Sequence, residues 1–571
     1  MNINIQLVPF SAPLTFLSVT DITRKVWGYR VPSQFPKEGL YIRSAKCGWS
    51  GEGGQVARIV VLSDGIEVPY TYEATPWEIT VNAAEGTIRM TFDYAGTLRI
   101  AGSGVTLKLE LPVGVYNEPL PYSENQWSLS AFKFESKFLF SEISGSLSCV
   151  ISDEETRKGG VDFITSGENW ECSIDESSCV HMPHESYGSY EACKEHFRKE
   201  FIEYADKACA GVPERLLEAA HQAAYVNYTA QVDGDLMHGP VMLMSKNWMN
   251  GVWTWDCQFN AVETSTYDSE ASWNNFASPF RYQHKSGMLF DVLWDHRYSD
   301  TYTKPPVHGW ALSHLRKAGI LSKEQKKWAY EHLLRLVNAW YTYMDWDHDG
   351  ICQYNHGNDS GWDNCTYFMC GAPIEGPDLS AYLTICLDEL AVIADELGMH
   401  DAARSHREQA DLQLERIIKH SWDGDHFHTY QSGTHKEMDD CDSLLPYLPI
   451  ILGKRLPKEI FDKMASDLME ENRFLTPFGL ATEHVNDRFY ISDGYWRGPI
   501  WAPAMMFIIY GLADGGKTEF AADLAERFCL NCAKEGFAEN FDATTGAGLR
   551  DRAYTWTASV FLILAKHYVK K

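Results

Sequence analysis

The chain has 571 residues, of which 45% are hydrophobic and 22% are charged. This length exceeds one ordinary domain and predicts two domains with sizeable cores. The 78 acidic residues outnumber the 50 basic ones and give a net charge of −28. Because such a surface repels phosphate backbones and anionic lipid, the charge argues against a nucleic-acid or membrane partner.

Residues 1–20 contain no basic cluster ahead of an apolar core, so the sequence does not predict a signal peptide there. No apolar run approaches the roughly 20 residues of a membrane span. The 14 cysteines are scattered, and Cys529 and Cys532 form a single C-x-x-C within a helical pattern. We interpret them as reduced thiols packed on a helix, not as zinc or redox ligands, and expect a cytoplasmic protein.

Residues 1–205 show the alternation of half-buried β-strands. The segment 105–111 alternates Val and Leu with Thr, Lys and Glu, and segments 57–62 and 87–92 behave similarly. Asp64-Gly65 and Glu85-Gly86 are typical of turns between strands. Many short strands with frequent turns predict a β-sandwich domain, followed by a helical linker over 186–210.

Residues 206–571 change to helical periodicity. Apolar residues from Leu379 to Leu397 recur at intervals of four and three, and Ser322 with Gln325 forms a capping-box pattern. The pattern predicts twelve helices: 214–229, 251–266, 284–296, 309–319, 323–344, 378–397, 402–420, 442–452, 457–470, 498–512, 518–534 and 551–568. The fold class is therefore mainly α, with twelve helices that fit an (α/α)6 barrel behind the β-sandwich.

One loop between predicted helices concentrates polar groups. Residues 356–364, His-Gly-Asn-Asp-Ser-Gly-Trp-Asp-Asn, combine two carboxylates, two glycines and an indole. An acid beside an indole tends to keep its proton, as a general acid for glycoside cleavage must. A polar turn between helices explains the same residues without function.

Four further loops place charged residues among aromatic ones. They are Trp253-Thr254-Trp255-Asp256, Lys304-Pro305-Pro306 with His308 and Trp310, Gly494-Tyr495-Trp496-Arg497, and Glu539-Asn540-Phe541-Asp542. Each alone is explained by packing, a structural salt bridge or an acidic turn. All of them fall at helix ends, which is where the loops of a toroid line its funnel. With 19 Trp in the chain, stacking on sugar faces is the function that this pattern favours.

The order of these segments resembles glycoside hydrolase family 63, which includes processing α-glucosidases and has trehalases as relatives. The motifs are W-x-W-D-x-x-F, K-P-P-x-x-G-W, H-G-N-D-S-G-W-D-N, P-D-L-S-A-Y-L, G-Y-W-R-G-P-I-W and E-N-F-x-x-x-T-G, over about residues 250–560. The resemblance implies an (α/α)6 barrel that inverts configuration, behind an N-terminal β-sandwich. It implies no cofactor and a small carbohydrate as the partner.

By motif position, the resemblance implies that Asp363 is the general acid and Glu539 the general base. The candidate substrate-binding residues in the same motifs are Trp255, Asp256, His308, Trp310, Asp359, Trp362, Tyr495, Trp496 and Arg497. Asp363 and Glu539 are 176 positions apart (539 − 363), so they meet only if the helices close into a ring. Trp362 offers desolvation to Asp363, and we therefore expect Glu539 to be the more polar and ionised of the two.

Two details leave alternatives open. Related trehalases have Glu where this chain has Asp359, which affects a substrate contact. Asp345, Asp347 and Asp349 followed by Gly350 match the start of an EF-hand loop, but position twelve falls on His356 instead of Glu. A solvated acidic turn and a calcium loop both fit that segment, and we predict no metal.

The sequence thus predicts an inverting exo-α-glycosidase, with an α-glucosidase acting on short oligosaccharides or small α-glycosides as the leading form. A mannosylglycerate-type α-glycoside hydrolase is the alternative in substrate. A sugar epimerase and an inert sugar-binding protein are the alternatives in class. The sequence gives no oligomeric state.

Overall fold

The computed structural model describes residues 1–23, 37–47, 54–111, 118–151, 160–182, 185–438 and 441–570. The chain divides into two compact units, each described here by itself. The sheet unit comprises Met1–Lys207, Ala224–Gly234 and Ser245–Gly251. The helical unit comprises Ala208–Ala223, Asp235–Met244 and Val252–Lys571. Two short segments after residue 207 thus belong with the N-terminal unit.

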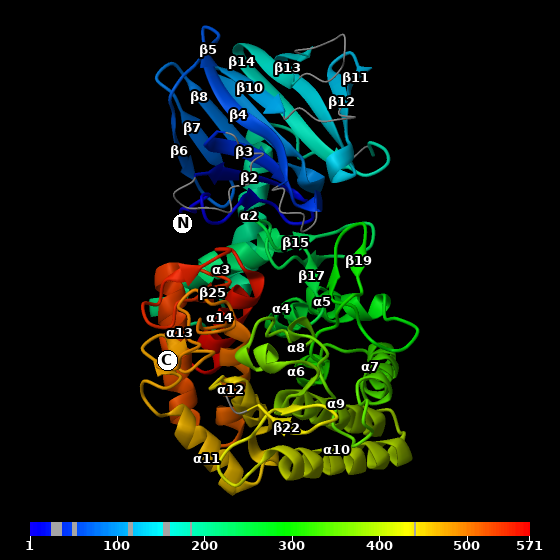
Figure 1. The fold of residues 1–571 in the computed structure, drawn as a ribbon. Helices are drawn as coiled ribbons and strands as arrows, with labels where there is room; N and C mark the ends of the chain where they lie inside the picture. Colours follow the sequence, from blue (N-terminus) through cyan, green and yellow to red (C-terminus); the bar gives the residue numbers. More distant parts are fainter. Residues whose placement is uncertain are drawn as a thin grey trace. The chain divides into compact units, whose positions relative to one another are not determined.

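The sheet unit is built on antiparallel strands that hydrogen bonds join into one 14-stranded sheet (Figure 1). The strands are β1 (Phe10–Ser11), β2 (Leu17–Ile22), β3 (Gly39–Ser44), β4 (Gln55–Ser63), β5 (Ile66–Glu67), β6 (Thr71–Ala74), β7 (Ile79–Asn82), β8 (Thr87–Phe92), β9 (Leu98–Ser103), β10 (Thr106–Leu111), β11 (Glu118–Ser123), β12 (Gln126–Ala131), β13 (Ser136–Ile151) and β14 (Val161–Ser177).

The long strand β14 organises this sheet. Its first part pairs with β10, from Val161 to Ile164, and its second part pairs with β9, from Asn169 to Ile174. The predicted strands over 57–62, 87–92 and 105–111 are confirmed as parts of β4, β8 and β10. In β10 burial alternates residue by residue, as the Val/Leu alternation requires. The two facing sheets of a sandwich stay a prediction, since the hydrogen bonding is continuous.

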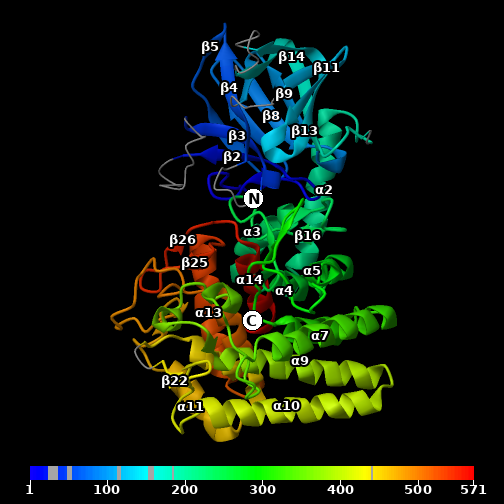
Figure 2. The same cartoon turned by 45° about the vertical axis from the view of Figure 1, so that its right-hand side comes forward.

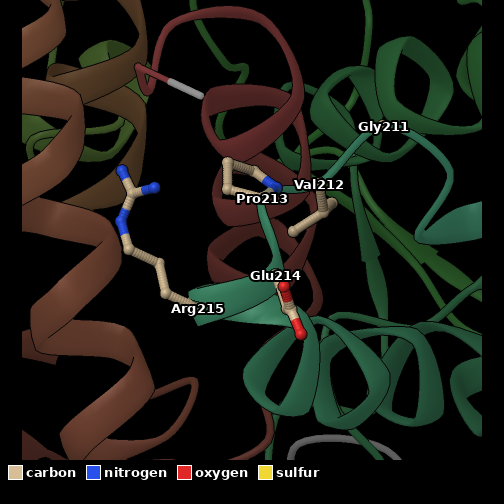
Figure 3. Close-up of a pocket in the computed structure, with 5 residues that line it drawn as sticks. All are labelled: Gly211, Val212, Pro213, Glu214 and Arg215. Carbon is tan, nitrogen blue, oxygen red and sulfur yellow. The ribbon is translucent and has the colours of Figure 1, made fainter.

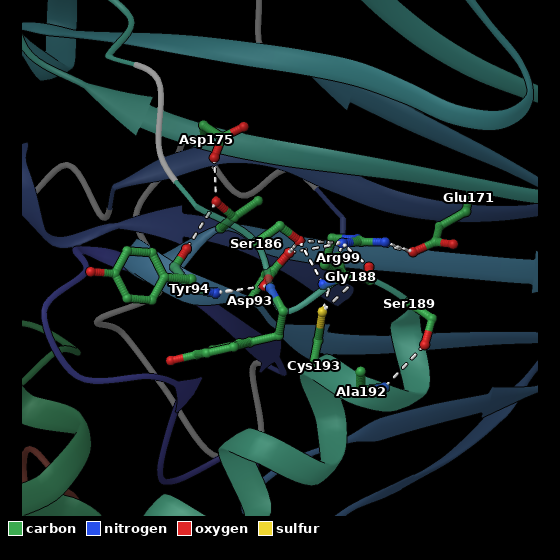
Figure 4. Close-up of polar contacts among 12 residues, drawn as sticks. Asp93, Tyr94, Arg99, Glu171, Asp175, Ser186, Gly188, Ser189, Ala192 and Cys193 are labelled. Carbon is green, nitrogen blue, oxygen red and sulfur yellow. Dashed lines mark hydrogen bonds and ion pairs between the residues drawn. The ribbon is translucent and has the colours of Figure 1, made fainter.

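A polar network ties the sheet to the segment before α2 (Tyr190–Ala208) (Figure 4). Arg99 Nη1 donates to Asp93 Oδ2 at 2.8 Å, and the same guanidinium pairs with Glu171. Asp93 also accepts from the hydroxyl of Ser186 and from the N–H of Tyr187. Burial opposes the charge, but these hydrogen bonds hold the pKa of Asp93 below its ordinary value. The carboxylate is therefore fully partnered.

The helical unit contains most of the helices. They are α4 (Asp256–Thr264), α5 (Ser269–Arg281), α6 (His308–Lys317), α7 (Lys323–Tyr343), α8 (Gly357–Ser360), α9 (Pro377–Glu396), α10 (His400–Ser421), η7 (Leu445–Arg455), α11 (Lys458–Leu468), α12 (Ala502–Asp514), α13 (Thr518–Glu535) and α14 (Thr555–His567), while η5 (Glu214–Leu216) leads into α3 (Leu217–Ala230), which runs across the division between the units. The predicted capping box of Ser322 and Gln325 is confirmed at the start of α7.

Helix contacts in this unit form a closed circuit. α4 contacts α6, α6 contacts α9, α9 contacts η7, η7 contacts α12, α12 contacts α14, and α14 returns to α4. The other helices pack outside this circuit: α5 against α4 and α6, α7 and α10 against α9, α11 against η7, and α13 against α12 and α14. Figure 2 shows α9 and α10 running side by side. These contacts arrange six helical elements in one ring of neighbours.

One predicted helix is wrong, and one observed helix was not predicted. Residues 284–296 form no helix but contain β18 (Val292–Leu293), which pairs with β17 (Val252–Trp253) and β19 (Tyr298–Ser299). Val292 between the aromatic residues Phe290 and Trp294 suits a strand, and Gly287 takes a φ of 98°. Helix α5 was not predicted because Asn274, Asn275 and Pro279 weaken its pattern.

Residues 211–215 line a surface hollow where the helical unit begins (Figure 3). Arg215 extends from it to Glu526 of α13 at 2.7 Å and donates to the carbonyl of Lys570. The ion pair anchors the start of the unit to its last helices.

The structure also bears on the predictions of free cysteines and of no membrane-spanning segment. All cysteines whose side chains are described are free thiols, including the buried Cys529 and Cys532. None of the described helices combines the length and the apolar character that crossing a lipid bilayer requires.

Candidate active site

The loop from His356 to Asn364 begins with the single-turn helix α8. The side chain of His356 accepts the N–H of Asn358, and Asp359 completes the capping box. The helix ends at Gly361, whose φ is 73° and where a Cβ atom would lie 2.5 Å from the indole of Trp255. Only glycine fits this position, because both the backbone angle and the space exclude a side chain.

Asp359 holds the loop from behind. Its Oδ2 accepts the N–H groups of Asn355 and His356, each at 3.1 Å, and its Oδ1 accepts the N–H of Thr303 at 3.2 Å. The residue is 4% exposed, and burial raises its pKa against these hydrogen bonds. Asp359 therefore positions the loop relative to the segment before α6.

Lys304 is the cation at the centre of the site. Its Nζ donates to the carbonyl of Asn358 at 2.8 Å and lies 3.2 Å from Asp291 Oδ1 and 3.7 Å from Asp363 Oδ1. The side chain is only 5% exposed. Burial alone would lower its pKa, but the neighbouring acids, Asp363 and Asp291 first, raise it above the ordinary value. Lys304 is therefore charged at neutral pH.

Asp256, the first residue of α4, is a further buried acid near Lys304. It is 3% exposed, and its Oδ2 has no hydrogen-bond partner among the described residues. Burial raises its pKa well above the ordinary value, opposed by Lys304 and reinforced by Asp291 and Asp363. Burial therefore favours the protonated form of Asp256 relative to an exposed aspartate.

Asn364 connects the Asp363 loop to the Gly494–Arg497 segment. Its Nδ2 donates to the carbonyl of Gly494 and its Oδ1 accepts the N–H of Trp496, both at 2.9 Å. Between these anchors Tyr495 takes a left-handed φ of 65°, which is strained for a bulky residue. Trp501 Nε1 donates to the carbonyl of Tyr495 at 2.8 Å. These bonds hold the tyrosine against its backbone preference.

The hydroxyl of Tyr495 lies within electrostatic range of both candidate catalytic acids. Burial raises its pKa well above the ordinary value, and the charges of Asp363 and Glu539 raise it further. Arg550 opposes them, with its guanidinium 4.8 Å from the centre of the tyrosine ring. Two carboxylates that are 176 positions apart (539 − 363) therefore act on one phenol.

Glu539 stands before the hairpin of β25 (Asn540–Phe541) and β26 (Gly548–Leu549). Its N–H donates to the carbonyl of Asp551 at 2.7 Å. Glu539 is 3% exposed, whereas the Asp363 side chain is 31% exposed. Trp362 was expected to shield Asp363 from solvent, but the Asp363 side chain is partly exposed. The reason is that the Trp362 ring packs on Trp496, with centroids 4.7 Å apart.

Several indole rings pack against one another in the segments that carry these acids. Trp496 stacks on Trp501 with centroids 3.9 Å apart and planes 7° from parallel. Trp255 lies 6.2 Å from Trp496 and 5.5 Å, edge on, from Trp556. The aromatic cluster joins α4, the Asp363 loop, the 494–501 segment and α14.

Three predicted substrate-binding residues lie apart from this group. His308 is 1% exposed, its ring is 5.0 Å from that of Phe280, and burial lowers its pKa to about 3. Trp310 is equally buried, 5.4 Å from Phe259. Arg497 donates to the carbonyl of Phe489. Their substrate contacts stay predictions.

Sequence reasoning missed Asp291, Lys304 and Asn364 as site residues. Lys304 stood in the K-P-P motif and Asn364 in the H-G-N-D-S-G-W-D-N motif, so both were visible but were given no role. Asp291, flanked by Phe290 and Val292, was hidden inside a segment assigned to a helix.

The carboxylates of the acidic turn at Asp345–Asp349 contact protein groups. Asp345 Oδ2 accepts the N–H of Gly350, while Asp347 Oδ2 lies 3.0 Å from His435 Nε2. His356, at position twelve, caps α8 instead. The EF-hand-like spacing of this turn therefore does not continue to its last ligand position.

Buried carboxylates beside stacked indoles, at the loop ends of a helical unit, define a site suited to cleaving glycosidic bonds. The chain is a glycoside hydrolase: residues 249–557 match the model described as the mannosylglycerate hydrolase MGH1-like glycoside hydrolase domain. It belongs to that family, within glycoside hydrolase family 63, as its motifs predicted.

Three relatives agree with this membership. A probable mannosyl-oligosaccharide glucosidase from Schizosaccharomyces pombe is 25% identical over 215 residues, 34% of this chain and only 26% of the relative. A mannosylglycerate hydrolase from Rubrobacter radiotolerans is 22% identical over 405 residues, 54% of this chain and 89% of the relative. A mannosylglycerate hydrolase from Thermus thermophilus is 30% identical over 93 residues, 16% of this chain and 21% of the relative.

Solved structures share the fold. A Thermus thermophilus family 63 mannosylglycerate hydrolase in complex with Tris matches with a TM-score of 0.51 and 18% identity, over 60% of this chain and 98% of that one. The same enzyme in complex with Tris and D-glycerate gives a TM-score of 0.51 and 16% identity over the same shares.

Proposed function

We propose that this protein is an inverting exo-α-glycosidase in which Asp363 is the general acid and Glu539 the general base. The observation that carries the proposal is that residues 249–557, which contain both carboxylates, match a glycoside hydrolase family model. Inversion needs one acid to protonate the leaving oxygen and a second carboxylate to activate water on the opposite face of the sugar. The closed circuit of six helical elements, with further helices outside it, supports an (α/α)6 barrel as the scaffold.

The division of labour between the two groups rests on their motif positions, because their burial is the reverse of the desolvation expected for the acid. The Asp363 side chain is partly exposed, whereas Glu539 is buried beside the hairpin of β25 and β26. Lys304 lies 3.7 Å from Asp363 and compensates the negative charge of the acids around it.

The sugar-binding subsite in this proposal is formed around the indoles. Trp255 and Trp496 offer apolar ring faces, and no described protein group bonds the Oδ2 of Asp256, so it is available to a sugar hydroxyl. Trp310, His308 and Arg497 are secondary candidates, since each contacts protein groups in this structure. Asp359 and Trp362 support the acid loop from behind.

The substrate we propose is a small α-glycoside. An α-glucoside remains the leading sugar from the motifs. An α-mannoside of a small acid such as glycerate is the second candidate, and it is favoured by the family model and by the relatives named mannosylglycerate hydrolase. Lys304 and Arg550 give the site cations that an acidic aglycone would need.

A substrate panel tests the proposal. The purified protein is incubated with aryl α-glucoside, aryl α-mannoside, α-linked disaccharides and mannosylglycerate, and early turnover is followed by proton NMR. We expect release of the β-anomer, with Asp363 and Glu539 carboxyl groups ~6.5–9.5 Å apart. An α-anomer as the first product would reverse the assignment of mechanism. Isomerised sugar without hydrolysis would indicate an epimerase, and binding without turnover a sugar-binding protein.

A further inference from the structure

A short hairpin follows the last residue of α10, Ser421. Trp422 and Phe427 form an isolated bridge, and the N–H of His428 donates to the carbonyl of Ser421 at 2.8 Å. Gly424 supplies the turn with a φ of 107°. The segment is therefore held in a defined conformation by its own backbone.

Side-chain alternation sorts this hairpin into two faces. Trp422 and Phe427 pack together with centroids 5.1 Å apart, and Phe427 is 3% exposed. Because residues on a strand alternate between faces, Asp423, His426 and His428 share the opposite face. Asp423 and His426 are 41% and 46% exposed on this side, so an ion from solvent reaches them directly.

The donor atoms on this face converge. His428 Nε2 lies 2.9 Å and His426 Nδ1 3.8 Å from Asp423 Oδ2, and one ligand atom from each of the three residues lies within 4.8 Å of the others. A tetrahedral zinc ion with bonds of about 2.0–2.1 Å separates its ligand atoms by about 3.3 Å. The two spacings to Asp423 Oδ2 are thus each within about half an ångström of the tetrahedral value.

Asp423 is oriented for this role. Its Oδ1 accepts the N–H of Asp425 at 2.7 Å and of His426 at 2.9 Å, which leaves Oδ2 facing the two imidazoles. The neighbouring Asp425 is paired with Lys463 at 3.0 Å.

Glu437 supplies the second contact to His428. Its Oε1 lies 2.6 Å from His428 Nδ1, and its strand β22 (Lys436–Glu437) is paired with β21 (Tyr430–Gln431). A carboxylate that binds one ring N–H fixes the tautomer and leaves the other nitrogen free to bind metal.

We propose that Asp423, His426 and His428 bind one divalent transition-metal ion of the zinc class, with Glu437 orienting His428. Two imidazoles and one carboxylate favour zinc, cobalt or nickel over calcium and magnesium, which prefer oxygen ligands alone. Three protein ligands leave a fourth position for water. This site is separate from Asp363 and Glu539 and does not depend on the proposed glycosidase.

The test is a calorimetric titration of the full-length protein with zinc chloride, combined with anomalous scattering from crystals soaked in the same salt. We expect an ion bonded to Asp423, His426 and His428. His428→Asn and His426→Asn should each lower the stoichiometry by one ion, and Glu437→Gln should weaken binding ~10- to 100-fold.

Two control variants separate this site from others. His400→Asn removes an exposed histidine paired with Asp395 at the other end of α10 and should change nothing. His435→Asn removes the histidine of the Asp347–Asp349–His435 group and should leave the hairpin ion in place. An ion found only at that second group, or equal zinc binding by wild type and His428→Asn, would overturn the proposal.

Discussion

Arg99 in the sheet unit and Lys304 in the helical unit are both buried cations that lie among carboxylates. Arg99 pairs with Asp93 and Glu171. The carboxylate of Asp93 also accepts hydrogen bonds from the hydroxyl of Ser186 and from the N–H of Tyr187. Lys304 faces Asp291 and Asp363 directly and acts on Asp256, whose Oδ2 has no hydrogen-bond partner in the part of the chain that the structure describes.

The difference teaches how to tell a structural charge cluster from a reactive one. In the first cluster the pKa of Asp93 is lowered, because its hydrogen bonds outweigh burial. In the second, burial raises the pKa of Asp256 well above its ordinary value. Groups left short of partners are the ones available to a substrate. Four experiments sharpen this comparison.

Removing the catalytic carboxylates should give the largest effect. We expect Asp363→Ala to lower the rate on natural glycosides ~10²–10⁴-fold, and much less on a glycosyl fluoride, whose leaving group needs little protonation. Glu539→Ala should slow both substrates alike, since every substrate needs activated water. The measurement is the ratio of fluoride to disaccharide activity. A Glu539→Ala variant that is spared on the fluoride would show that acid and base are reversed. Glu171→Ala, in the structural cluster, should leave the rate unchanged.

Removing each cation should separate stability from activity. Lys304→Met and Arg99→Met each leave buried carboxylates unpaired, which costs about 3–5 kcal/mol of unfolding free energy. Only Lys304→Met should also lower kcat/KM, because only its acids belong to the active site. Adding Asp291→Asn to Lys304→Met should restore part of the stability. Calorimetric unfolding and steady-state kinetics measure the two effects. An Arg99→Met variant with the larger loss of activity would break the comparison.

Asn364→Ala should have an intermediate effect. It removes the two hydrogen bonds that fix Gly494 and Trp496 around the strained Tyr495, at a cost of about 1–3 kcal/mol. Tyr495 is then free to relax to a negative φ, and we expect about a tenfold loss in kcat, in line with a small displacement at the site. Asn486→Ala, which removes an exposed side-chain bond to the Asn472 carbonyl, is the matched control. A crystal structure with Tyr495 unmoved would contradict this role of Asn364.

The smallest effect should be in the pH dependence of stability. Because the pKa of Asp93 is lowered on folding, its contribution is present above the ordinary value of 3.8 and is lost as the pH falls. The pKa of Asp256 is raised, so folding takes up a proton and stability falls as the pH rises above 3.8.

The corresponding Asn variants should flatten opposite sides of the profile. Asp93→Asn should reduce the acid-side loss, and Asp256→Asn should reduce the loss toward neutral pH. Each change should amount to about 1.4 kcal/mol for every pH unit that separates the folded and unfolded pKa of the replaced acid. Unfolding midpoints measured at several pH values against wild type report both slopes. Slopes of the same sign in the two variants would contradict the difference between the clusters.

Sequence patterns predicted the helical periodicity and the loops that carry the acids, because both depend on local residue order. Twelve apolar-periodic segments were predicted, and only 284–296 proved not to be helical. The missed residues depend on distant contacts: Lys304 meets Asp363 across 59 positions (363 − 304), and the amide of Asn364 reaches Trp496 across 132. The burial of Glu539 by its hairpin, and the turn of Trp362 toward Trp496, are likewise set by packing that no local pattern contains.

The closed circuit of helices has a consequence for biosynthesis. It is closed by Asn260 of α4, whose Nδ2 donates to Thr555 Oγ1 and whose Oδ1 accepts from Ser559 of α14, across 295 and 299 positions. All three side chains are fully buried. At about 5–20 residues per second, a ribosome takes roughly 15–60 s to make the intervening chain. During that time α4 has no partner at this contact, and its apolar face is a natural substrate for chaperones.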